Sequence, residues 1–314
     1  MTAFELTQYH GIVPPILTPF EPNGQVDLRS LFRLTRWLLL EGVHGIWACG
    51  TTGEFPCIDA DERENVVGTC VEAVNGKVPV VANVSDCSTR LAIQHAERAI
   101  RAGADAIAAT PPYYYLNSQD ELLAHYRQIR EEIDAPLFVY NIPSTVKVKV
   151  EIETIITLAA EGTVIGIKDS QGDLVFARNL TQAAEDRGAP LRVFLGSRML
   201  DDAMKVRGVH GVIPGIANVV PKACVQAYEA AVQGDWPAAA EAQRVVEAAL
   251  ALGQVMGEGS NHSKMLGGVK AALKAMGVIA HATLAAPLRT PTAEEEERVA
   301  ALTRELNLRQ PVPA

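Results

Sequence analysis

One lysine stands where a strand-like run gives way to polar residues. Residues 164–167 are apolar and rich in β-branched side chains, and Lys168 follows them directly, ahead of Asp169 and Ser170. Such runs are typical of strands that are covered on both faces of a sheet. The Lys168 amine would then lie at the mouth of a sheet, partly removed from water, where the neutral form that attacks carbonyl groups is favoured. The simpler alternative is a lysine that extends from a strand end into solvent.

Three other segments carry groups that could assist a nucleophilic amine. The run GTTGE, residues 50–54, offers two hydroxyls and a glycine-rich backbone that can approach a small carboxylate. Taken alone it is also a common polar turn ahead of a helix. Tyr113, Tyr114 and Tyr115 stand together in a chain that is only 5% aromatic, and Tyr140 ends another apolar run. A tyrosine hydroxyl beside an amine can move protons during Schiff-base chemistry.

The elements that must position these groups alternate along the chain. Eight strand-like runs are separated by segments with helical periodicity, which predicts an α/β protein with a (β/α)8 TIM barrel. After residue 233 no further strand-like run occurs, and we expect a C-terminal helical extension over residues 234–314, with a frayed end at 309–314. The predicted strands are residues 11–17, 44–49, 78–84, 105–109, 136–140, 164–167, 191–195 and 211–213. The predicted helices are residues 28–40, 61–74, 88–102, 118–133, 151–160, 174–185, 199–206 and 217–232, then 238–252, 263–276 and 293–306.

Composition excludes several classes of function. The 314-residue chain has a formal net charge of −9, which disfavours nucleic acid and anionic membranes as partners. No apolar stretch is long enough to span a membrane, and the start of the chain lacks the pattern of a signal peptide. Five cysteines without a paired spacing predict free thiols and a cytoplasmic location. The histidines show no metal-binding spacing and no dinucleotide fingerprint is present, so we expect neither a metal nor a nucleotide cofactor.

The segments GTTGE, TPPYYY, YNIP and GIKDS occur in this order on successive predicted strands. Together with the opening run of residues 11–20, GIVPPILTPF, they resemble the dihydrodipicolinate synthase / N-acetylneuraminate lyase family of class I aldolases. The resemblance extends over essentially the whole chain. It implies a Schiff base between Lys168 and pyruvate, or the 2-oxo acid half of a larger substrate. It also implies Tyr140 as the general acid and base, and Thr51 and Tyr114 as a proton relay.

The same resemblance implies the surroundings of the reaction. Thr52, with backbone N–H groups near Gly50, would hold the substrate carboxylate, and Ile213 would shape the pocket. Tyr114 would reach the site of a neighbouring subunit, in a homotetramer built as a dimer of dimers.

Two positions depart from the family pattern. Synthases that condense pyruvate with aspartate semialdehyde have an arginine where this chain has Thr145, and a hydroxyl cannot replace a bidentate guanidinium. After the seventh strand, where the lyase branch places acidic residues, Arg198 follows Gly196 and Ser197. The hypothesis is a substrate whose distal end is anionic or rich in carbonyl groups. The alternative is that Arg198 pairs with an acid of the next helix, Asp201 or Asp202.

The resulting prediction is a pyruvate-dependent Schiff-base lyase or aldolase that acts on a 2-oxo acid, such as a 2-oxo-3-deoxy sugar acid. A second possibility is 4-hydroxy-tetrahydrodipicolinate synthase. A possibility of another class is a non-catalytic relative that serves as a sensor or scaffold. Retention of Lys168, Tyr140, Thr51 and Tyr114 argues against the last of these.

Overall fold

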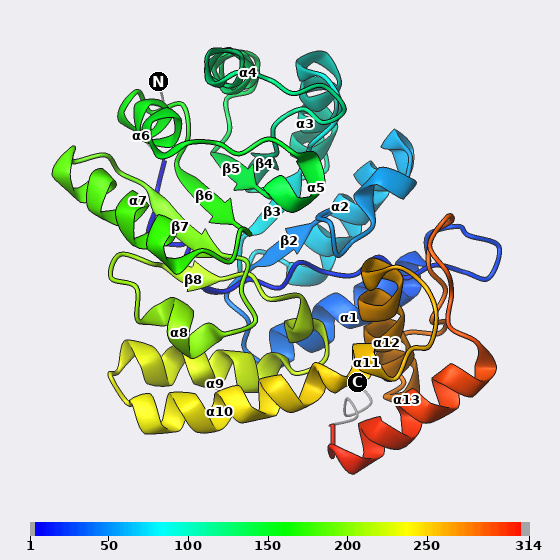
Figure 1. The fold of residues 1–314 in the computed structure, drawn as a ribbon. Helices are drawn as coiled ribbons and strands as arrows, with labels where there is room; N and C mark the ends of the chain where they lie inside the picture. The colour runs from blue at the N-terminus through cyan, green and yellow to red at the C-terminus, as the bar shows by residue number, and fades with distance from the viewer. Residues whose placement is uncertain (1–3, 309–314) are drawn as a thin grey trace.

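The computed structural model describes residues 4–308 and contains one sheet of eight parallel strands (Figure 1). Neighbouring strands follow the order β1-β8-β7-β6-β5-β4-β3-β2, and helices separate them along the chain. The architecture is the predicted (β/α)8 barrel, and additional helices follow it at the C-terminal end of the chain. The strands are β1 (Gly11–Ile12), β2 (Ile46–Ala48), β3 (Val80–Asn83), β4 (Ala106–Ala109), β5 (Leu137–Asn141), β6 (Gly166–Asp169), β7 (Arg192–Leu195) and β8 (Gly211–Val212).

The first strand is shorter than the predicted residues 11–17, and its end closes the barrel. Pro14 and Pro15 lack the N–H that a continuous ladder requires, so regular pairing stops at Ile12. The chain beyond it stays extended. Trp47 donates its N–H to the Pro14 carbonyl at 3.0 Å, and the Trp47 carbonyl accepts from Ile16 at 3.0 Å. These bonds join the β1 segment to β2 while β1 itself pairs with β8.

The first four helices of the barrel start where the sequence supplies caps. Side chains of Asp27, Asp59, Ser88 and Ser118 accept hydrogen bonds from the first turns of their helices, as N-cap residues do. The helices are α1 (Leu28–Leu40), α2 (Ala60–Val74), α3 (Thr89–Arg101), α4 (Gln119–Glu132), α5 (Pro143–Val146), α6 (Ile152–Ala160), α7 (Leu174–Asp186), α8 (Leu200–Met204) and α9 (Pro221–Val232).

Two predicted helices needed correction. The eighth barrel helix begins at Pro221 rather than at residue 217, because a proline is accommodated in the first turn but not in a helix interior. A separate 3-10 turn, η2 (Gly215–Asn218), precedes it. The helix predicted at residues 199–206 is shorter in the structure, where α8 spans only Leu200–Met204.

The C-terminal extension comprises α10 (Trp236–Ala249), α11 (Ala251–Gln254), α12 (Asn261–Ala275) and α13 (Ala293–Glu305). In Figure 1 α10 runs alongside α9, and α12 and α13 lie on the side of α1. Because α10 packs directly on a barrel helix, the division between residues 233 and 234 stays a prediction. Residues 309–314, predicted to fray, lie outside the described range. Within that range no helix is long and apolar enough to cross a membrane.

A buried ion pair joins the extension to the barrel. Lys270, in the middle of α12, places its ammonium 2.5 Å from a carboxylate oxygen of Glu54, and both side chains are at most 1% exposed. The Thr283 carbonyl accepts a second bond from Lys270, and the other oxygen of Glu54 accepts from the backbone N–H of Ala285. Glu54 belongs to the GTTGE segment after β2, so this pair holds that loop against the helices of the extension.

We expect Lys270→Ala to lower the free energy of unfolding by about 3–5 kcal/mol, because it leaves the Glu54 carboxylate buried without a countercharge. Urea unfolding would measure the loss. The matched control is Lys274→Ala in the same helix, where the partly exposed pair with Glu296 is worth at most about 1 kcal/mol. Equal losses in the two variants would contradict a special role for the buried pair.

Candidate active site

Lys168 and Tyr140 lie side by side on neighbouring strands. They are register partners between β5 and β6, and both side chains are buried. The Lys168 amine lies 4.0 Å from the centroid of the Tyr140 ring and 4.8 Å from that of Trp47. The amine is therefore enclosed by two aromatic faces at the end of the barrel where loops follow the strands. The alternative, in which this lysine extends into water, is wrong, since only 3% of the residue is exposed.

Burial sets the protonation state of this amine. No ion pair links Lys168 to an acid among the described residues, and burial lowers its pKa from 10.5 to about 7. A substantial share of the amine is then neutral near pH 7. A neutral amine is what attack on a carbonyl carbon requires.

Tyr140 connects the lysine to the GTTGE loop. Its hydroxyl lies 3.0 Å from the hydroxyl of Thr51, within hydrogen-bond distance. Burial raises the pKa of Tyr140 to about 12, although hydrogen bonds with Thr51 and Ser170 oppose that shift. Tyr140 is therefore protonated at neutral pH and can pass its proton on through a hydroxyl chain.

The GTTGE loop is held in an unusual backbone conformation. Cys49 and Glu54, which flank its first four residues, both adopt left-handed φ angles, 53° and 56°. Such conformations are costly for side-chain-bearing residues and persist where surrounding contacts fix them. Gly50 also packs tightly, because a Cβ there would lie 3.0 Å from the Trp47 ring. The loop thus presents Thr51 toward Tyr140, while the ion pair with Lys270 holds Glu54 at its other end.

The sequence analysis gave no role to Ser170 or to the hydrogen-bonded pair of Asp169 and Asn141. Ser170 shares the hydrogen-bonding environment of the Tyr140 hydroxyl. Gly196 after β7 leaves room for it, because any Cβ at that position would collide with the Ser170 hydroxyl. Asp169 accepts from the Asn141 amide at 2.8 Å, which ties the ends of β5 and β6 together. The sequence feature that could have indicated these contacts is the pair of polar residues, Asp169 and Ser170, directly after Lys168.

Tyr114 is not brought into this site within a single chain. The residue is 86% exposed, and its backbone φ of 95° is strained for a tyrosine. Its ring contact is with Tyr115, whereas Tyr113 packs against Phe55. Tyr115 and Leu116 are also exposed, and together with Tyr114 they form an apolar surface on the loop that follows β4.

The remaining predicted residues fall into three places. Ile213 is buried in the barrel interior, in the cluster that includes Trp47 and Tyr140. Thr145 is exposed on the short helix α5. Thr52, Gly196 and Arg198 line one cleft of about 1130 Å³, which also involves the extension.

The alternative ion pair for Arg198 is not formed. Asp201 and Asp202 both pair with Lys205, at 3.6 and 2.9 Å, and neither pairs with Arg198. Arg198 is instead an exposed residue at the rim of the cleft, where its backbone carbonyl accepts a bond from Gln243. The opposite wall, formed by α11 and the start of α12, was not anticipated from sequence.

Known proteins resemble this chain over nearly its full length. Residues 8–306 match the family described as the dihydrodipicolinate synthetase family. An uncharacterised DapA-like lyase of Halobacterium salinarum is 37% identical, covering 90% of this chain and 88% of that protein. The 4-hydroxy-tetrahydrodipicolinate synthase of Phenylobacterium zucineum is 36% identical, covering 75% and 79%.

Solved structures agree with these sequence relatives. Dihydrodipicolinate synthase of Bacteroides thetaiotaomicron superimposes with a TM-score of 0.88 at 29% identity, covering 94% of this chain and 98% of that one. The chloride-inhibited dihydrodipicolinate synthase of Acinetobacter baumannii, solved in complex with pyruvate, gives a TM-score of 0.82 at 29% identity, with 95% and 99% covered.

The lowered pKa of Lys168 predicts how adduct formation depends on pH. Enzyme and pyruvate would be mixed briefly at each pH and then quenched into borohydride at one fixed pH. The initial rate of adduct formation should rise through pH 7 and level off above it. A rate that keeps rising through pH 10 would indicate an ordinary lysine. In Tyr140→Phe the rate should fall by roughly 10²–10⁴-fold with the same midpoint, because burial rather than the hydroxyl sets the pKa.

Proposed function

The chain belongs to the dihydrodipicolinate synthetase family of pyruvate Schiff-base lyases, and we propose that Lys168 forms that Schiff base. The observation that carries the proposal is the buried amine, which lies against Tyr140 and forms no ion pair within residues 4–308. The substrate is pyruvate or a larger 2-oxo acid. A 2-oxo-3-deoxy sugar acid is the class we favour, cleaved or formed at the bond beside the bound pyruvate unit.

The proposed chemistry assigns each group one task. The neutral Lys168 amine attacks the ketone carbon, and a proton moves from nitrogen to oxygen to give a carbinolamine. Tyr140, with Thr51 behind it, donates the proton with which the hydroxyl leaves as water. The product iminium lies over the faces of Tyr140 and Trp47, which attract a cation. A base then takes the proton of the hydroxyl two carbons away from the iminium carbon, and Tyr140, which has just given up its own proton, can accept it. The bond between that hydroxyl-bearing carbon and the α-carbon breaks, its electron pair passes to the iminium to give an enamine, and the hydroxyl-bearing carbon leaves as an aldehyde.

The loops around the lysine support the remaining roles. Thr52 lies next to Thr51 in the glycine-bounded turn and lines the cleft, which suits a residue that holds the substrate carboxylate together with the backbone near Gly50. Ile213 lies in the cluster of Trp47 and Tyr140 beneath the amine and would shape the space around the pyruvate unit.

We further propose a homotetramer, built as a dimer of dimers, that works in the cytoplasm without a metal ion. An exposed, strained Tyr114 within an apolar surface is expected of a side chain that completes the site of a second copy. The five cysteines are unpaired thiols. The iminium itself accepts the electrons, so the proposed reaction needs no Lewis acid.

Borohydride reduction in the presence of pyruvate tests the proposal. A reduced adduct should appear on the peptide that contains Lys168, and Lys168→Ala should abolish it while the thermal unfolding curve shows a folded protein. Lys222→Ala, an exposed lysine on α9, is the control and should react like the wild type. An adduct on another lysine, or none in a folded wild type, would refute the mechanism.

A second candidate is 4-hydroxy-tetrahydrodipicolinate synthase, the name of several relatives. Thr145 argues against efficient use of aspartate semialdehyde, because a lost charged hydrogen bond costs about 1.5–3 kcal/mol, or roughly ten- to hundred-fold. We expect condensation of pyruvate with the semialdehyde to be at least about tenfold less efficient than turnover of the best sugar acid. Thr145→Arg should improve the condensation with aspartate semialdehyde, and the neighbouring substitution Ser144→Arg should not. Equal efficiency in the wild type would show that this reading of Thr145 is wrong.

A further inference from the structure

The cleft beside the active site is formed by two parts of the chain that lie far apart in sequence. On the barrel side it is lined by Thr52 and by the loop after β7, including Arg198. On the other side lie α11 and the first turn of α12, including Asn261 and Lys264. Its volume, about 1130 Å³, is at the upper end of what small-molecule sites provide. Pyruvate alone would leave most of that space to water or to the rest of a longer substrate.

The charge of this lining is opposite to that of the protein. The chain carries a net charge of −9, yet the residues that line the cleft include two cations, Arg198 and Lys264, and no carboxylate. Neither cation forms an ion pair with any residue between 4 and 308. Lys264 is only partly exposed and lies in the first turn of α12, where a positive charge opposes the helix dipole and an anion would be favoured.

Acidic residues do occur close to the barrel side of the cleft, but each is already engaged. A smaller adjoining cavity is lined by Asp169, Asp173 and Asp202. Asp169 accepts from amides of Asn141 and Gln171, and Asp173 caps the start of α7. Asp202 pairs with Lys205. Arg198 and Lys264 are therefore the charges in this region that are free to bind an anion.

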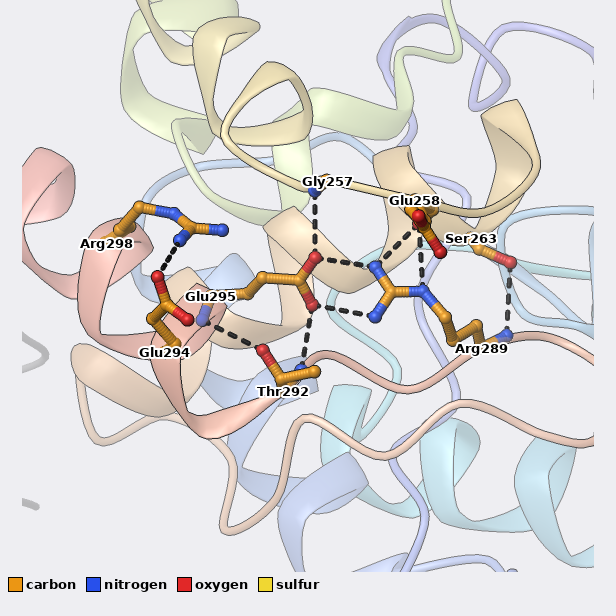
Figure 2. A network of polar contacts seen from close by, with 8 residues as sticks. All are labelled: Gly257, Glu258, Ser263, Arg289, Thr292, Glu294, Glu295 and Arg298. Atoms are coloured by element: carbon orange, nitrogen blue, oxygen red, sulfur yellow. Dashed lines mark hydrogen bonds and ion pairs between the residues drawn. The ribbon is translucent and has the colours of Figure 1, made fainter.

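The wall that carries Lys264 is firmly attached to the rest of the extension. Glu295, at the start of α13, accepts from the backbone N–H of Gly257 and from two nitrogens of Arg289, as Figure 2 shows. Arg289 in turn donates to the Glu258 carbonyl, and its backbone N–H donates to the Ser263 hydroxyl. These contacts hold the loop before α12 at Gly257, Glu258 and Ser263, and so they position the backbone that carries Lys264.

We propose that Arg198 and Lys264 bind a second acidic group at the distal end of the substrate. This inference rests on the proposed function, which fixes the 2-oxo end of the substrate at Lys168 and Thr52. The substrate class is then a 2-oxo acid that is anionic at both ends, with a carboxylate or a phosphate at the far end. Asn261, one turn of α12 before Lys264, adds an amide donor on the same wall.

Borohydride trapping at Lys168 supplies the assay. Half-saturating concentrations would be measured for 2-oxoglutarate, 2-oxoadipate and 2-oxopimelate, and for the matched monoacids 2-oxopentanoate, 2-oxohexanoate and 2-oxoheptanoate. At least one diacid should bind about tenfold or more tightly than its monoacid, as expected for charged hydrogen bonds. The phosphonate analogues of the same lengths distinguish a carboxylate site from a phosphate site by which tail gives the larger gain.

The variants locate the effect. Arg198→Ala and Lys264→Ala should each reduce the preference for the doubly charged ligand, and the double variant should abolish it. Pyruvate trapping should stay near that of the wild type in all three. Arg178→Ala, an exposed arginine on α7, is the matched control and should retain the preference. No preference in the wild type, or a preference that survives the double variant, would overturn the inference. If borohydride traps no pyruvate adduct in the wild type, the proposed function itself is refuted.

Discussion

The buried ion pair between Glu54 and Lys270 joins the GTTGE loop of the barrel to the C-terminal extension. It joins residues 216 positions apart and is almost fully removed from water. A charged pair of this kind is costly to bury and contributes stability only while both partners remain. The pair also sets the position of the GTTGE loop relative to α12. Glu54 ends the loop that carries Thr51 and Thr52, and Lys270 lies in the helix whose first turn carries Lys264. One contact therefore relates the reacting end of the site to the wall opposite it.

The chain buries a second lysine in a different environment. Burial lowers the pKa of Lys270 too, but the Glu54 carboxylate opposes that shift, and the bonds of Lys270 to Glu54 and to the Thr283 carbonyl give it a structural role. Within residues 4–308, Lys168 lies against aromatic faces and forms no ion pair with an acid, so no countercharge opposes the effect of burial, which lowers its pKa to about 7. Burial alone therefore does not make a lysine nucleophilic. The difference lies in what the neighbouring strand and loop supply: Tyr140 in register with Lys168, and Glu54 facing Lys270.

The sequence predicted the barrel well because its signals are local and repeated. Short β-branched runs, capping residues and their regular alternation with helices placed all eight strands, and the motifs around Lys168 and Tyr140 placed the two residues that prove to be register partners. Two of the errors, at β1 and α9, occurred where a proline decides the start or end of an element, and a third is the helix predicted at residues 199–206, which is shorter in the structure. Contacts over long sequence distances could not be read in the same way. Lys270 sits among apolar neighbours in α12, which was a usable signal of burial, but nothing in the sequence identified Glu54 as its partner.

The same reasoning explains why specificity was harder to predict than chemistry. In the proposed mechanism the reaction depends on groups fixed by neighbouring strands, whereas the cleft proposed for the rest of the substrate lies between loops of the barrel and the helices α11 and α12 that follow it. Arg198 could be recognised as unusual from its own loop, but its lack of an acidic partner and the presence of Lys264 opposite it follow only from the folded structure. The C-terminal extension thus lines the cleft that we propose holds the distal end of the substrate, and it also supports the barrel. A change in this extension can alter which 2-oxo acid fits while Lys168 and Tyr140 remain in place.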